Sequence, residues 1–178
     1  MKVHRIVMGL ATVAVVIGLN TRAEAAQSKA SAQPKAEVGD EKDETVSMAK
    51  VPKVVRDTLS QYAKDSEVQS ASKGDVDGTA VYEFDIDQGA RKFEVAITPK
   101  GAFFGSEEVI QLSGVPDAAR NTFTQQAQGG KIVSVEKAVD KNKKTNYEAV
   151  IEKGGKRTEV VVDPNGKVVS TETVTPGQ

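Results

Sequence analysis

The stretch Lys131–Glu172, KIVSVEKAVDKNKKTNYEAVIEKGGKRTEVVVDPNGKVVSTE, decides the fold of this 178-residue chain. Within it, Tyr147, Ala149 and Ile151 occupy every second position, which is typical of a strand with one buried face. Further on, Asp-Pro-Asn-Gly at 163–166 places Pro at the start of a type I turn and Gly at the left-handed position that completes a three-residue hairpin loop. This turn predicts that Val162 pairs with Val168.

The same pattern occurs once before, between Val51 and Val109. Both copies begin with Val-Pro, continue through Tyr-Glu-x-x-Ile, and end in a hairpin with an x-Pro-x-Gly turn. The matched pairs are Val51/Val115, Pro52/Pro116, Arg56/Arg120, Thr58/Thr122, Tyr82/Tyr147, Glu83/Glu148, Ile86/Ile151, Gly89/Gly154, Glu94/Glu159, Val95/Val160, Pro99/Pro164, Gly101/Gly166, Glu107/Glu172 and Val109/Val174. A period longer than about 50 residues indicates duplicated small domains rather than a solenoid.

Each copy is predicted to begin with a helix, because proline is well tolerated at the first helical position. One helical face carries Val51, Val54, Val55, Leu59, Tyr62 and Ala63, and the second copy repeats it with Val115, Ala118, Ala119, Phe123 and Ala127. Four strands follow each helix. We therefore predict an α+β fold of two tandem α-β-β-β-β repeats, at 47–111 and 112–178, each with one helix on an antiparallel sheet. Domains this small are marginal alone, so the repeats should dock.

The strand alternation divides the sheet into two faces. The hairpin register predicts that Phe93, Val95, Ile97 and Phe103 face the helix, with Ile97 opposite Phe103 and Ala96 opposite Phe104. The opposite face then carries an apolar set, namely Ala96, Phe104, Val161 and Val169. These four are candidate partner-binding residues, since exposed apolar patches often mark contacts. The alternative is that the two repeats cover each other there. An acidic row, Glu83, Asp85 and Asp87, is either a solvated sheet face or a face that attracts a cation or a basic partner.

The N-terminus is typical of an export signal. Lys2 and Arg5 precede an apolar run from Ile6 to Leu19, and small residues flank Glu24. We predict a signal peptide at 1–25 and a polar, disordered leader at 26–46. An uncleaved membrane anchor is the alternative, but the run is short for a span of about 20 residues. The mature protein is expected to be periplasmic or secreted.

Composition argues against catalysis. The chain has no cysteine or tryptophan, and its single histidine, His4, lies in the predicted signal. Ser-His and Cys-His chemistry, disulfides and ordinary zinc sites are therefore excluded from the mature chain, and no cofactor or metal is expected. Two motifs have ordinary explanations. Ser47–Lys50 fits S-x-x-K without its partner motifs, and Asp75–Gly78 is a turn rather than a calcium loop.

The pattern of motifs resembles the PepSY-like family, also described as β-lactamase-inhibitor-like. The elements that carry the resemblance are Val-Pro opening a helix, Tyr-Glu-x-x-Ile, Glu-Val-x-Val/Ile and x-Pro-x-Gly, spread over residues 51–174. The resemblance implies an exported, non-enzymatic module that binds or inhibits other proteins. It also implies that tandem copies form a concave sheet surface. This chain departs from the inhibitor by lacking disulfides.

These observations favour one function and leave an alternative. The preferred hypothesis is an exported, non-catalytic protein-binding or inhibitory module that uses its sheet surface against another exported or envelope protein. It is expected to be a monomer that binds neither nucleic acid nor membrane, because the chain has a formal net charge of −1 and no basic block. The alternative is a structural or stress-related envelope protein that binds cations through its acidic sheet face.

Overall fold

The computed structural model describes residues 44–76 and 78–174. The predicted signal peptide at 1–25 and most of the predicted leader at 26–46 lie outside the described residues. The elements in chain order are β1 (Glu44–Thr45), α1 (Lys53–Leu59), β2 (Val68–Val76), β3 (Thr79–Asp87), β4 (Lys92–Ile97), β5 (Phe103–Val109), α2 (Asp117–Gln126), β6 (Lys131–Asp140), β7 (Thr145–Lys153), β8 (Lys156–Val162) and β9 (Val168–Val174). Single-turn 3₁₀ helices lie at Met48–Lys50, Asp65–Glu67 and Leu112–Gly114.

The strands form one nine-stranded antiparallel sheet in simple sequence order, β1 to β9. The two halves of the chain join where β5 pairs with β6, from Gly105 opposite Asp140 to Val109 opposite Glu136. The α+β class predicted from the sequence is therefore confirmed. The halves meet edge to edge through backbone hydrogen bonds rather than face to face, so neither half covers the other's sheet.

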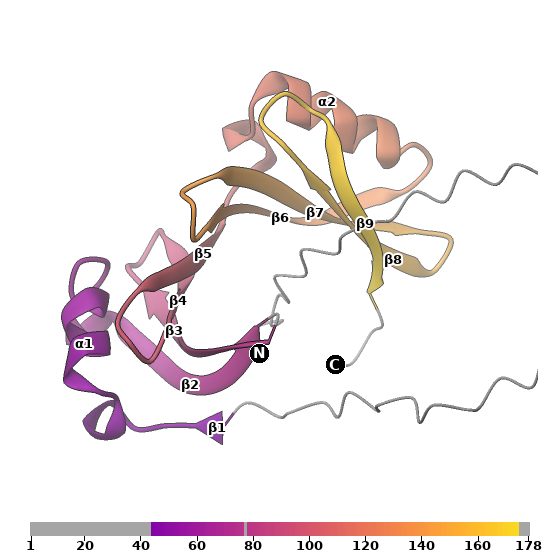
Figure 1. Ribbon diagram of the computed structural model, residues 1–178. Coiled ribbons are helices and arrows are strands. Elements are labelled where there is room, and N and C mark those ends of the chain that lie inside the picture. Colours follow the sequence, from indigo (N-terminus) through magenta and orange to yellow (C-terminus); the bar gives the residue numbers. More distant parts are fainter. Residues whose placement is uncertain (1–43, 77, 175–178) are drawn as a thin grey trace, which may run out of the picture.

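Both helices lie on the outer, convex side of the curved sheet (Figure 1). Under α1, the apolar core comprises Val51, Val55, Leu59, Ala63, Ala71, Phe84, Ile86, Phe93, Val95 and Ile97. Under α2, it comprises Val115, Ala119, Phe123, Val135, Tyr147, Ala149, Ile151, Val160 and Val162. Phe103 packs partly buried against the first core. The helix-facing residues predicted from the hairpin register are thus confirmed, and the opposite face of the sheet is concave.

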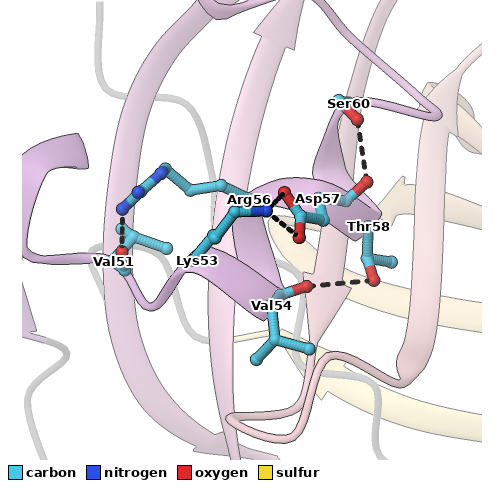
Figure 2. A network of polar contacts seen from close by, with 7 residues as sticks. All are labelled: Val51, Lys53, Val54, Arg56, Asp57, Thr58 and Ser60. Carbon is cyan, nitrogen blue, oxygen red and sulfur yellow. Dashed lines mark hydrogen bonds and ion pairs between the residues drawn. The ribbon is translucent and has the colours of Figure 1, made fainter.

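Each helix forms a side-chain hydrogen bond with the last hairpin turn of its half. The Thr58 hydroxyl donates to the carbonyl oxygen of Gly101 at 2.7 Å, and Thr122 donates to that of Gly166 at the same distance. Figure 2 shows α1 itself, where Arg56 reaches back to the carbonyl of Val51. Each threonine bond joins a helix to a turn about 43 residues away. These bonds therefore help to hold each helix in place on the sheet.

Three local predictions were wrong. The first helix ends at Leu59, before Tyr62 and Ala63, because its last turn tightens into 3₁₀-type bonds such as Tyr62 N–H to the Leu59 carbonyl at 2.8 Å. Val54 is 47% exposed, since it lies over the turn at Gly101 and beside the buried face. A bulge at Phe104 places Ala96 opposite Gly105, because two residues of β5 there face one residue of β4.

The two short motifs have structural roles. Ser47 and Lys50 are both exposed and flank a 3₁₀ turn, and the Asp75 carboxylate accepts a hydrogen bond from the Gly78 N–H at 2.6 Å in the turn before β3. No helix within residues 44–76 and 78–174 is long and apolar enough to cross a membrane.

Candidate binding surface on the concave face

The concave face carries far more acid than the sequence prediction recognised. Residues paired across neighbouring strands share a face of the sheet. Register places Asp85 beside Glu94 and Glu94 beside Glu107. In the second half it places Glu136 beside Glu148, and Glu159 beside Glu172. The acidic row predicted on β3, Glu83, Asp85 and Asp87, is therefore one end of an acidic surface that crosses the sheet.

Six glutamates of this surface were missed, namely Glu94, Glu107, Glu136, Glu148, Glu159 and Glu172. A signal for most of them was present in the sequence. Three of the repeated pairs, Glu83/Glu148, Glu94/Glu159 and Glu107/Glu172, place an acid at the same position of both copies. Alternation would have placed these acids on the face away from the helix. The acids lie close together because the strands bearing them are neighbours in one continuous sheet.

Several of these carboxyl groups are shielded from solvent. Glu107 is only 6% exposed, and burial, followed by the charges of Glu148, Glu94, Glu136 and Glu159, raises its pKa to about 10. Burial, followed by the charges of Glu159, Glu136 and Glu172, raises the pKa of Glu148 to about 8. Burial, followed by the charge of Glu159, raises the pKa of Glu136 to about 7. Burial and the charge of Glu172 also raise the pKa of Glu159. A curved sheet crowds the side chains on its inner face, so polar residues there become buried.

Three buried oxygens have no hydrogen-bond partner among the described residues. They are Glu107 Oε1, Asn146 Oδ1 and Glu148 Oε2. An unsatisfied buried polar group costs about 1–3 kcal/mol, and more when it is charged. The concave face is therefore destabilising as it stands, and a donor brought by another molecule would relieve it.

A cavity of about 210 Å³ is lined by residues of the first half, from β2 to β5, and by Glu136 of β6. Its wall includes Asp85, Glu94 and Glu107 from the first half and Glu136 from the second, with Val109 as an apolar contribution. Lys92 also lines the cavity, but its ammonium group is paired with Asp87 at 2.9 Å. The Ser70 hydroxyl donates to Asp85. The cavity thus combines several acidic groups with a mainly apolar lining, to which Ile86, Phe93 and Val109 contribute.

The four apolar candidates for partner binding lie away from the helices, as predicted. Ala96 and Phe104 form a buried cluster with Val81, and Lys141 places its ammonium group 5.5 Å from the centre of the Phe104 ring. Ala96, Phe104 and Val161 are 5–8% exposed, whereas Val169 is 38% exposed. Only Val169 therefore offers much of its side chain to another molecule, and the apolar patch expected from the sequence is largely closed.

The described residues contain no group of three or more acidic, histidine or cysteine side chains arranged to hold a metal ion. The glutamates are spread along paired strands, so their oxygens do not converge on one point as calcium coordination requires.

Residues 116–172 match the family model of the peptidase propeptide and YPEB domain, PepSY. The resemblance to this family predicted from the sequence is therefore confirmed, and the match covers α2 and most of the strands that follow it. No curated protein matches the chain.

Three solved structures show the same fold. A protein from Bacteroides eggerthii proposed to be periplasmic has a TM-score of 0.59 and 17% identity, covering 70% of this chain and 90% of its own. A DUF2874 family protein from Bacteroides uniformis has a TM-score of 0.60 and 14% identity, covering 71% and 92%. A BLIP-like protein from Bacteroides fragilis has a TM-score of 0.57 and 17% identity, covering 71% and 89%. At such identities the likeness concerns the fold.

Proposed function

We propose that this protein is an exported, non-catalytic binding module whose concave sheet face contacts a second protein. The observation that carries the proposal is the pair of buried carboxyl groups on that face, Glu107 and Glu148, each with an oxygen that has no partner among the described residues. Both helices pack on the other face. The concave face therefore has no described helix over it.

The charge of the concave face supports a basic partner. The face carries acids from β3 to β9, and two of the cations on it, Lys92 and Arg157, are paired with Asp87 and Glu152 at 2.9 and 3.0 Å. A basic protein surface would be attracted to it and would supply the missing donors. We therefore infer a partner whose contact surface is rich in lysine or arginine.

The comparisons support the rest of the proposal. The matched family is named for a peptidase propeptide and one structural neighbour is BLIP-like, which supports a binding or inhibitory role, and another neighbour is proposed to be periplasmic. Together with the predicted signal peptide, they favour a periplasmic or secreted protein. The equivalent helix-to-turn bonds at Thr58 and Thr122 support two copies of one module. The alternative, an envelope protein that binds inorganic cations, lacks a coordinating cluster among the described residues.

The test uses two charge reversals with opposite expectations. The predicted mature chain, residues 26–178, is used to capture proteins from envelope and secreted fractions, beside Glu172→Lys on the concave face and Glu44→Lys on β1. Both residues are exposed, so both variants should fold. A specific partner should be lost at least tenfold with Glu172→Lys and retained with Glu44→Lys. Capture that responds equally to both reversals would contradict a concave binding face.

A further inference from the structure

The cavity at the junction of the two halves contains a buried acid without a partner. Glu107 is 6% exposed, lines the cavity, and its Oε1 accepts no hydrogen bond from the described residues. Glu107 lies on β5, the last strand of the first half, and Glu136 reaches the same cavity from β6, the first strand of the second. The pairing of these two strands brings Glu136 to a cavity whose other lining residues come from the first half.

The surroundings of Glu107 favour a cation over a neutral ligand. Its neighbours in the cavity wall include Asp85, Glu94 and Glu136, and the one lysine in the wall is engaged by Asp87. A positive charge placed there would gain from several carboxylates at once in a region partly shielded from water, where such interactions are stronger than at an open surface. A metal ion is a poor fit because the described acids do not converge.

We propose that this cavity binds a lysine side chain presented by the partner protein, with Glu107 as the counter-ion of its ammonium group. The proposal rests on the proposed function and adds the chemistry that the concave face recognises. Val109 and the aliphatic portions of the acidic side chains would contact the alkyl stem. The ammonium group would donate to Glu107 Oε1, and Glu107, which holds a proton in the unbound protein, would release that proton to water on binding.

Geometry favours lysine over arginine. Only one oxygen of Glu107 is both buried and without a partner. A guanidinium group pairs best through two parallel bonds to both oxygens of a carboxylate, whereas an ammonium group is a compact charge with three donors that can be shared among several acids. A single carboxylate oxygen without a hydrogen-bond partner, with acidic neighbours nearby, suits an ammonium group better than a guanidinium group.

The test uses n-butylammonium as a probe for the lysine side chain, with n-butanol, n-propylguanidinium and Ca²⁺ as comparisons. Binding to the predicted mature chain is followed by NMR of the side-chain carboxyl carbons and backbone amides. Glu107→Gln removes the counter-ion without changing the shape of the side chain. Glu44→Gln is the control, because Glu44 is exposed on β1 and lies outside the cavity.

We expect n-butylammonium to give saturable shifts centred on Glu107, and its affinity to fall at least tenfold in Glu107→Gln but less than twofold in Glu44→Gln. Undiminished binding by Glu107→Gln would overturn the assignment. So would equal saturation by n-butanol, tighter binding of n-propylguanidinium, or displacement of the probe by Ca²⁺ at equal concentration. If Glu107→Gln loses the probe but keeps the captured partner, the lysine assignment fails while the binding function stands.

Discussion

The two halves of the molecule share one scaffold but differ on their inner faces. On the helix side, corresponding contacts recur almost unchanged, as in the threonine bonds from Thr58 and Thr122 to the turns at Gly101 and Gly166. On the concave side, Glu107 and Glu172 occupy matched positions in the repeat, yet Glu107 is buried and Glu172 is exposed. The difference arises because β5 lies inside the sheet and β9 ends it. Equivalent residues acquire different chemistry from their place in the whole sheet.

A second contrast lies in the apolar cluster of the concave face. In the first half, Val81, Ala96 and Phe104 pack together and are buried. The matched positions of the second half carry Asn146, Val161 and Val169, where Asn146 has an orphaned oxygen and Val169 is 38% exposed. The first half therefore closes its inner face with apolar contacts, while the second leaves a polar, more open one. Partner contact is expected to extend toward the second half.

The largest expected effect tests the shared scaffold. Gly166 has φ +83°, and a Cβ there would lie 2.6 Å from the carbonyl oxygen of Ala118. Gly166→Ala should therefore lower the free energy of unfolding by about 3 kcal/mol, measured by urea denaturation. Gly101→Ala should cost somewhat less, because its nearest contact is a movable Val54 methyl group.

Gly154→Ala is the control for the glycine substitutions. Gly154 also has a positive φ, but no atom lies within 4 Å of its added Cβ. Its cost should be limited to the conformational strain of about 1–2 kcal/mol. Equal losses of unfolding free energy at Gly154 and Gly166 would show that α2 does not lie as close to the turn at Gly166 as described.

The next effect concerns the matched acids. Burial and the facing charges of Glu148, Glu94, Glu136 and Glu159 raise the pKa of Glu107 to about 10, from an ordinary value of 4.5. The folded state therefore binds a proton that the unfolded state releases above pH 4.5. The stability contributed by protonated Glu107 is complete below that pH and is lost as pH rises toward 10. Glu107→Gln, which stays neutral, should be nearly equal in stability to wild type at pH 4.5, more stable by about 2 kcal/mol at pH 6, and more stable again at pH 8.

Glu172→Gln should show a much smaller gain over the same pH range, because Glu172 is exposed. Urea denaturation at pH 4.5, 6 and 8 measures both variants against wild type, so that pH effects on other groups cancel. A gain for Glu107→Gln that does not grow with pH would mean that Glu107 is ionised in the folded protein.

The smallest effect tests the open cluster of the second half. Asn146→Val replaces a side chain with an orphaned oxygen by the residue found at the matched position, Val81. Removing an unsatisfied polar group should raise the free energy of unfolding by about 1 kcal/mol. The reverse change, Val81→Asn, should lower it by more, because Val81 is fully buried. Destabilisation by Asn146→Val would show that Asn146 forms a favourable interaction.

Much of the fold could be predicted from local patterns. The alternation at Tyr147–Ile151 and the Pro-x-Gly turns specify strands, hairpins and the face each residue occupies, because these depend on a few neighbouring residues. The short end of α1 and the bulge at Phe104 could not be predicted, since each depends on how the turn and its neighbouring strand fit together. The docking of the halves was expected, but the edge pairing of β5 with β6 follows from no local signal.

The sequence by itself determined that acids recur at matched positions, Glu83/Glu148, Glu94/Glu159 and Glu107/Glu172, on the strand face away from the helix. Only the tertiary structure decided which of them are buried. Curvature and the junction of β5 with β6 gather Glu107 and Glu136 around one cavity, while the same residue type at Glu172 stays in water at the last strand. A strand pattern fixes the direction of a side chain, but the free energy of its charge depends on everything that the folded chain brings near it.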